Sequence, residues 1–249
     1  MFFDIKNRWS GQVQFSAEID CDINAETGIK VGLAVKLAVK TGASLVGANL
    51  ARASLARANL DGANLVGANL VGANLVGANL ARANLARASL DGANLARANL
   101  ARANLARASL DGANLARASL DGANLDGANL VGASLDGANL VGANLARASL
   151  DGANLARASL DGANLDNDEK LIGENPIWMA GPMGSRNAYL AVHRTDQGLR
   201  VRAGCFFGAA GGFLEAVART HEDNRHAVNY RAAIDAARVI LGSAEAGAD

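Results

Sequence analysis

With 249 residues the chain could form one or two ordinary domains, but 4% aromatic residues and two prolines are not the composition of an ordinary globular core. Lysine plus arginine and aspartate plus glutamate are equal at 24 each, so no net charge favours nucleic acid, an anionic membrane or a basic partner. The first residues are charged where a signal peptide needs an apolar run, and no apolar stretch has the length of a membrane span, so we expect neither.

Residues 1–40 contain a strand pattern followed by a helix pattern. Residues 2–19 predict a β-hairpin with its turn near Ser10. Residues 27–40 predict an amphipathic helix. The apolar face of this helix is expected to carry Ile29, Leu33 and Leu37.

A five-residue period dominates residues 41–165. Leucine occupies every fifth position from Leu45 to Leu165, twenty-five times, and alanine stands two residues before each leucine. Only Asn or Ser lies between them, and the leucine is followed by Val-Gly, Ala-Arg or Asp-Gly until the series closes. A helix is excluded, because five residues at about 100° each place successive leucines roughly 140° apart.

A short extended segment followed by a turn fits this period. Ala and Leu are two residues apart, so in a strand both point inward, and the Asn or Ser between them points outward, where stacked copies can hydrogen-bond along the array. Equal sides with corners of about 90° close after four repeats, and coils of about 20 residues then stack at roughly 4.8 Å. Twenty-five repeats therefore predict an all-β solenoid with a shaft of about 30 Å.

The two kinds of turn are expected to differ. In Asp-Gly and Val-Gly repeats the glycine falls where a type II turn requires a positive φ, so Gly62, Gly92 and Gly122 are expected in that conformation. Arginine at positive φ carries a steric cost that glycine avoids. The Ala-Arg turns are therefore predicted to avoid it, for example at Arg52, Arg97 and Arg117.

Residues 166–249 lack the repeat. Two strands are predicted at 188–194 and 199–202, and helices near 212–220 and 224–241, which together indicate an α+β domain. One side of the second helix is expected to carry Ala227, Tyr230, Ile234 and Ile240.

The Ala-[Asn/Ser]-Leu-x-x pattern of residues 41–165 resembles the pentapeptide-repeat family, whose fold is a right-handed quadrilateral β-helix. The stretches IKNRWSGQVQFSAEID and GIKVGLAVKLAVKTGASL are similar to the N-terminal leader of some bacterial and phage members. The stretches GPMGSRNAYLAVHRTDQGLRVRAGCFFG and FLEAVARTHEDNRHAVNYRAAI are similar to their C-terminal domain. Because a solenoid needs its open ends covered, we expect residues 1–40 to be an N-terminal cap and residues 166–249 a C-terminal cap.

The repeats of this array do not vary in sequence as those of natural arrays do, and this constancy is informative about its origin. The block ARASLDGANL recurs verbatim, starting at Ala86, Ala106, Ala116, Ala146 and Ala156. Either the array expanded recently or, as we favour, it is an engineered consensus placed between natural-type bacterial or phage caps.

Charged residues of the array give the first candidate site. Residues twenty apart are expected to stack, which predicts the pairs Arg97 with Arg117, Arg87 with Arg107 and Asp91 with Asp111. A ladder of arginines could bind phosphates, but eight aspartates interleave with the ten arginines in the sequence, so no nucleic acid is expected as a partner. Some members of the pentapeptide-repeat family imitate duplex DNA with an acidic rod and protect DNA gyrase, and this slightly basic array does not match that requirement.

Histidines, cysteines and glycines of the tail give the remaining candidates. His193, Cys205, His221 and His226 lack the tight spacing of zinc sites, and no partner residues mark a nucleophilic pair, so they are interpreted as cap residues. The glycine-rich stretch 204–212 lacks a Gly-Lys-Ser/Thr ending and is interpreted as a linker. Cys21 and Cys205 flank the array and cannot pair across a rigid shaft, which favours a reduced, cytoplasmic setting.

The sequence thus favours a non-enzymatic structural scaffold without catalytic residues, a metal, a cofactor, a specific ligand or a membrane partner. The alternative is a protein-binding module, such as a topoisomerase-binding DNA mimic, which the neutral charge disfavours. An enzyme or a ligand site would have to lie in residues 166–249. A homodimer through the C-terminal domain is left open.

Overall fold

The computed structural model describes residues 1–165, 169–173, 176–183, 188–203 and 206–242. These residues fall into two compact units, Met1–Ser159 and Leu160–Asp249, and each is described by itself.

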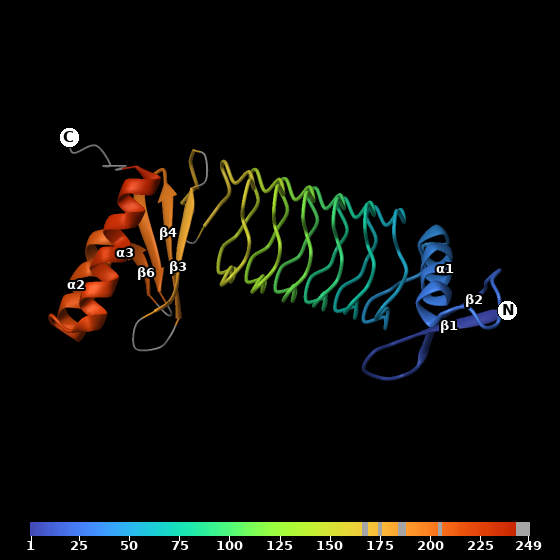
Figure 1. Cartoon of the computed structure of the whole chain (residues 1–249). Coiled ribbons are helices and arrows are strands. Elements are labelled where there is room, and N and C mark those ends of the chain that lie inside the picture. Colours follow the sequence, from blue (N-terminus) through green and yellow to red (C-terminus); the bar gives the residue numbers. More distant parts are fainter. Residues whose placement is uncertain (166–168, 174–175, 184–187, 204–205, 243–249) are drawn as a thin grey trace. The chain divides into compact units, whose positions relative to one another are not determined.

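The array coils once every twenty residues. From Asn49 to Ser159, the Asn or Ser of one repeat forms a parallel bridge with the Asn or Ser twenty residues later. The Leu105 N–H donates to the Asn124 carbonyl (2.7 Å), and the Asn124 N–H donates to the Ala103 carbonyl (2.9 Å). Each coil therefore holds four pentapeptides, as the sequence predicts, and Figure 1 shows the coils stacked along the array.

The interior of the array is a narrow core of alanine and leucine. Every Ala and Leu of the pattern between Leu45 and Leu145 is buried, and the leucines among them are no more than 1% exposed. Leu150 and Leu155 are only half-buried. The inward direction of both side chains, predicted from their spacing, is confirmed.

The prediction for the Ala-Arg turns was wrong. All ten array arginines lie at φ between 55° and 59°, close to the glycines that follow the repeat leucines, which lie at 61° to 67°. The Arg97 N–H donates to the Ala116 carbonyl (2.9 Å), and the Gly92 N–H donates to the Asp111 carbonyl (2.8 Å). Both turn types therefore keep the same bond to the next coil, and this bond requires a positive φ whatever the side chain.

A hairpin and a helix cover the first coil. Strands β1 (Phe2–Lys6) and β2 (Val13–Glu18) pair in antiparallel fashion. Beyond β1 the backbone continues onto the array, because the Arg8 N–H donates to the Gly47 carbonyl (2.7 Å). Helix α1 (Thr27–Lys40) follows, in agreement with the predicted bounds.

The face of α1 differs from the prediction. Its buried residues are Val31, Gly32, Ala34, Val35 and Ala38. Ile29 is exposed, and Leu33 and Leu37 are only half-buried. A Cβ on Gly32 would lie 2.1 Å from the Ser54 carbonyl oxygen, so the small residues of α1 approach the coil backbone more closely than the leucines could.

The second unit contains a four-stranded antiparallel sheet in the order β3-β4-β5-β6. Its strands are β3 (Ile177–Met183), β4 (Ala188–Thr195), β5 (Gly198–Ala203) and β6 (Phe206–Ala209). Helices α2 (Ala210–His221) and α3 (Arg225–Leu241) cover one face of this sheet (Figure 1). Within this unit, Lys170 bridges to Asn164 of the last repeats and Leu171 bridges to Thr195 of β4.

Two predictions for this unit need correction. Residues 206–209, interpreted as part of a linker, form β6, because Phe206 and Phe207 pair with Ala203 and Arg202. Ile240, placed on the buried side of α3, is 63% exposed. The buried residues of α3 are Ala227, Ala233, Ile234, Ala237 and Leu241.

Candidate functional site

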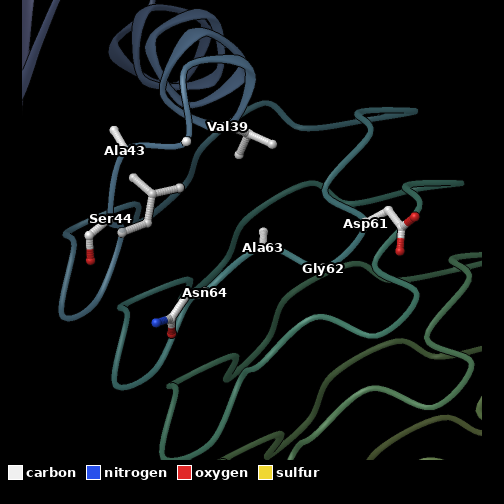
Figure 2. Close-up of a pocket in the computed structure, with 9 residues that line it drawn as sticks. Val39, Ala43, Ser44, Asp61, Gly62, Ala63 and Asn64 are labelled. Atoms are coloured by element: carbon white, nitrogen blue, oxygen red, sulfur yellow. The ribbon is translucent and has the colours of Figure 1, made fainter.

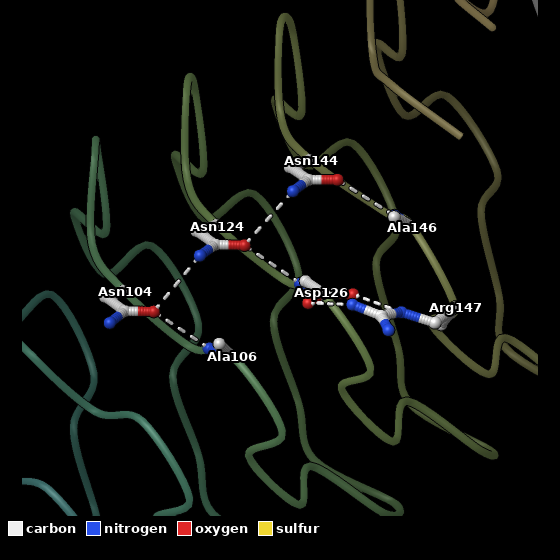
Figure 3. A network of polar contacts seen from close by, with 7 residues as sticks. All are labelled: Asn104, Ala106, Asn124, Asp126, Asn144, Ala146 and Arg147. Atoms are coloured by element: carbon white, nitrogen blue, oxygen red, sulfur yellow. Dashed lines mark hydrogen bonds and ion pairs between the residues drawn. The ribbon is translucent and has the colours of Figure 1, made fainter. Parts of the chain in front are cut away.

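Amide ladders occupy the outward side of the bridged segments (Figure 3). Asn124 donates through Nδ2 to Asn104 Oδ1, and Asn144 donates in the same way to Asn124 Oδ1, both at 3.4 Å. The Asn104 Oδ1 atom also accepts the Ala106 N–H (3.1 Å). The predicted hydrogen bonding along the stack is confirmed, and it uses the amide groups within the array itself.

The turns form four columns, since each turn lies above the one twenty residues earlier. Three columns of the first unit carry clear charge patterns. The acidic column contains Arg52, Asp91, Asp111 and Asp151. The basic column contains Arg57, Arg97, Arg117, Asp136 and Arg157. The second basic column contains Arg87, Arg107, Asp126 and Arg147. Charges that interleave in the sequence are therefore partly segregated in space.

Among the described residues of the array, three ion pairs join adjacent coils. Arg147 Nη2 lies 2.5 Å from Asp126 Oδ2, and Arg82 pairs with Asp61 in the same way. The third pair is Arg157 with Asp136. In all three pairs the arginine lies twenty-one residues after the aspartate. The hydrogen bond from Arg157 holds the pKa of Asp136 below its usual range. All three arginines are largely exposed, so these pairs contribute little to stability.

A pocket of 310 Å³ lies where α1 ends beside the first coils (Figure 2). Its polar lining includes the Asp61 carboxylate, the Ser44 hydroxyl and the Asn64 amide, and its apolar lining includes Val39 and Leu45. Because the Asp61 carboxylate is already engaged by Arg82, it does not offer a free charge to a ligand. The lining contains neither a histidine nor a cysteine.

The second unit contains buried polar groups, among them His193. Burial, with a contribution from the charge of Arg202, lowers the pKa of His193 to about 3, so the ring is neutral. Its Nδ1 atom has no hydrogen-bond partner among the described residues. Arg200 Nε donates to Glu169 Oε2 (2.7 Å), and both side chains are mostly buried. This ion pair, which was not predicted from the sequence, joins strand β5 to the segment that follows the last repeats.

The other tail candidates do not assemble into a site. The rings of His221 and His226 lie 5.7 Å apart, and His193 belongs to a different part of the unit, on β4. Cys205 and the first part of the stretch 204–212 lie outside the described residues. Within the described part of the chain, no three His, Cys, Asp or Glu side chains are grouped as a metal site would require. Nor does any described helix have the length and apolarity needed to cross a membrane.

Solved structures with similar repeats include three natural proteins. A pentapeptide repeat protein from the Arabidopsis thaliana thylakoid lumen is 33% identical, with a TM-score of 0.37 over 38% of this chain and 66% of that chain. One from the cyanobacterium Cyanothece 51142 is 35% identical, with a TM-score of 0.27 over 42% and 61%. HetL from Nostoc sp. strain PCC 7120, involved in heterocyst differentiation regulation, is 33% identical, with a TM-score of 0.22 over 49% and 74%. The chain thus spans less than two thirds of the first two proteins, and no curated protein matches it.

The family model for pentapeptide repeats matches residues 41–72, 63–100, 98–137 and 128–167, in eight copies. These ranges cover the whole array and just over half of the chain. Together with the twenty-residue coil and the Ala/Leu interior, they show that this protein is a right-handed β-helix solenoid of the pentapeptide-repeat family.

Proposed function

We propose that this chain is a non-enzymatic structural scaffold, a quadrilateral β-helix whose two ends are covered by residues 1–40 and 166–249. One observation carries the proposal: the backbone groups and many asparagine amides of the shaft are already paired within the shaft. Backbone N–H and C=O groups bond between coils, and asparagine amides bond both to the next coil and to their own turns. A surface of this kind offers regular shape rather than a prepared ligand site.

The quadrilateral form and the caps are supported by local geometry. Four bridged segments alternate with four turns in every coil. At the first coil, the Ser54 N–H donates to the Gly28 carbonyl of α1 (2.8 Å), and the Asn49 N–H donates to the Lys6 carbonyl (2.8 Å). In the last repeats, the Leu165 N–H donates to the Glu169 carbonyl (2.7 Å). These bonds satisfy backbone groups that an open end would expose.

The verbatim ten-residue blocks support an engineered consensus origin for the shaft. Cys21 is a free thiol, which supports a reducing compartment such as the cytoplasm. In this proposal the chain needs no cofactor or metal. A homodimer through the second unit would use exposed side chains of α3, among them Val228 and Val239.

The alternative is a protein-binding module that imitates duplex DNA. QnrB1, a plasmid-mediated fluoroquinolone resistance protein, is among the similar solved structures, at 20% identity and a TM-score of 0.29. A duplex carries one negative charge per ~1.7 Å of axis, so a shaft of about 30 Å would need roughly seventeen. The array has eight aspartates and ten arginines, and the balance favours the scaffold.

A supercoiling assay of DNA gyrase with added protein, beside a filter-binding titration with duplex DNA, tests the scaffold function. We expect no change in supercoiling and only weak, salt-sensitive DNA binding. Inhibition or protection of gyrase at micromolar protein would contradict the scaffold and support the binding module. Submicromolar DNA binding at physiological salt would also contradict it.

A further inference from the structure

Opposite charges face each other across one side of the shaft. The segments 93–95 and 113–115 lie between the acidic and the basic column, and their outward side chains are Asn94 and Asn114. We call this side, from residue 91 to 97 and its repeats at 111–117 and 151–157, the paired-charge face. Each of these repeats has an aspartate at one edge and an arginine at the other.

The central charges of this face are not neutralised by ion pairs. Among the described residues, Arg97, Arg117, Asp91 and Asp111 form no ion pair, and both arginines are exposed. Asp91 accepts hydrogen bonds from the Ser109 hydroxyl and the Asp111 N–H through a single carboxylate oxygen, Oδ1. The coils at 91–97 and 111–117 therefore each carry an exposed arginine without an ion pair on one edge and an aspartate on the other, although the charge of Arg117 also acts on Asp136.

A second copy of the chain matches this pattern when the two shafts run parallel. A two-fold axis parallel to the shaft places the acidic column of each copy opposite the basic column of the other, coil for coil. Arg97 then faces Asp91 of the second copy, and Arg117 faces Asp111. Facing sheets pack about 10 Å apart, a gap that an arginine and an aspartate side chain span together.

Other arrangements bring like charges together. An antiparallel pair on the same face sets the basic column against itself, so Arg97 and Arg117 repel each other across the interface. The parallel pair contains one such clash, between Arg57 and Arg52 of the first coil, two coils away from Arg97. It is outnumbered by the attractive pairs at the coils of Arg97 and Arg117, to which Arg157, already paired with Asp136, adds a weaker attraction to Asp151.

The neighbouring side of the shaft carries similar charges but is obstructed. It lies between the acidic column and the second basic column, where Arg87 and Arg107 stand. Arg8 reaches over this side, with Nη1 3.2 Å from the Ser89 hydroxyl and 3.3 Å from the Gly67 carbonyl. The Trp9 ring covers Gly47 and Gly67, which lie in the same column of turns as Arg87 and Arg107. The hairpin therefore prevents a second shaft from lying flat there.

We propose that the paired-charge face is a self-association surface, through which two copies of this chain pair side by side in parallel register. This rests on the proposed scaffold function and gives it a partner. The face is one side of a narrow shaft with opposite charges at three coils, so we expect the pairing to be weak and dominated by charge. It would bring shafts together at high local concentration and release them when salt rises.

Sedimentation velocity from about 10 µM to about 1 mM protein, at about 20 mM and about 500 mM NaCl, tests the proposal. At low salt the mean sedimentation coefficient is expected to rise with concentration, and at high salt the rise is lost. The double variant Arg97→Asp/Arg117→Asp and the double variant Asp91→Arg/Asp111→Arg should each remain monomeric. Asp is chosen at the turn because it tolerates positive φ better than most residues. A 1:1 mixture of the two variants should associate at least as strongly as the unmodified chain.

The matched control is Arg87→Asp/Arg107→Asp, which makes the same charge change in the same coils on the obstructed side. It should associate like the unmodified chain. Loss of association in this control but not in Arg97→Asp/Arg117→Asp would overturn the assignment of the face. A salt-independent dimer or a failure of the mixture to associate would also overturn the pairing. An unmodified chain that stays monomeric at all concentrations would also overturn the proposed pairing. The gyrase and DNA-binding assays test the scaffold function independently of this result.

Discussion

The arginine turns store conformational strain, and replacing Arg102 measures it. Arg102 lies at φ 57°, and its N–H donates to the Asp121 carbonyl (2.9 Å). Its Cγ lies 3.5 Å from the place that a Cβ on Gly122 would take, so the side chain also lies along the turn of the next coil. Arg102→Ala and Arg102→Gly both remove that contact and the charge. Only the alanine variant keeps a Cβ at positive φ.

The difference between these two variants has a definite sign. A left-handed conformation costs an L-residue about 1–2 kcal/mol. Glycine avoids this cost, but it also increases the conformational freedom of the unfolded chain, which lowers stability by about 0.4–1 kcal/mol. The glycine variant is therefore expected to be more stable than the alanine variant by about 0.5–1 kcal/mol.

Guanidinium unfolding followed by circular dichroism, with both variants in the same buffer, gives this difference from the shift in midpoint. Because repeat arrays can depart from two-state unfolding, equal slopes for the two variants are required before midpoints are compared. Hydrogen exchange of the amides around residue 102 provides a local check. An alanine variant that is as stable as the glycine variant, or more so, would refute the assignment of strain to these turns.

Three further predictions concern the core, the first coil and the second unit. Leu105→Ala should cost about 2–5 kcal/mol because the narrow interior cannot collapse around the cavity, and Leu165→Ala should cost less if the last repeats fray. Equal and negligible losses in denaturant unfolding would contradict an inward leucine. Gly32→Ala should destabilise the first coil by about 1–3 kcal/mol, because the added Cβ would lie 2.1 Å from the Ser54 carbonyl oxygen. Amide hydrogen exchange should then become faster in the first coil than in the rest of the array. His193 has a folded pKa of about 3, below its unfolded value of 6.5, so stability should fall as the pH drops from about 6.5 towards 3, by at most ~1.4 kcal/mol per pH unit. His193→Leu should flatten this dependence in urea unfolding at pH 4 to 7, and an unchanged slope would show that His193 is not its source.

The period of the array determined most of what could be predicted. Five-residue spacing fixes which side chains point inward, and the number of segments per coil follows from the turns, so the Ala/Leu core and the coil length needed no other information. The Ala-Arg turns could not be predicted in the same way. Local steric cost argued against positive φ at Arg97, but the bond from its N–H to the next coil is part of a continuous ladder, and the ladder decides the conformation.

The flanking units were harder because no period constrains them. In α1, leucine spacing suggested one buried face, whereas the small residues face the coil, since only glycine at position 32 allows its backbone to approach Ser54. Strand β3 contains Gly181 and Pro182, which weaken a strand signal, and as an edge strand it tolerates a proline. The Glu169–Arg200 pair joins residues thirty-one apart, a relation that depends on tertiary packing alone.

The partial segregation of charges on the shaft is related to two lengths that divide evenly into each other. A coil takes twenty residues, and the block ARASLDGANL takes ten, so each block fills half a coil. Copies that begin at Ala86, Ala106, Ala116, Ala146 or Ala156 are offset by multiples of ten, so their arginines can reach only two of the four columns. The aspartate four residues after each of these arginines falls in one of the other two columns. If a block began five residues later, its arginine would fall in one of the two columns that now receive the aspartates of the blocks. An array that contained blocks in both positions would therefore mix arginines and aspartates in every column. The ten-residue blocks therefore contribute to charged columns on a shaft in which eight aspartates nearly balance ten arginines. Where two blocks follow each other directly, at Ala106 and Ala116 and at Ala146 and Ala156, they place an arginine and an aspartate at matching heights on either side of one face.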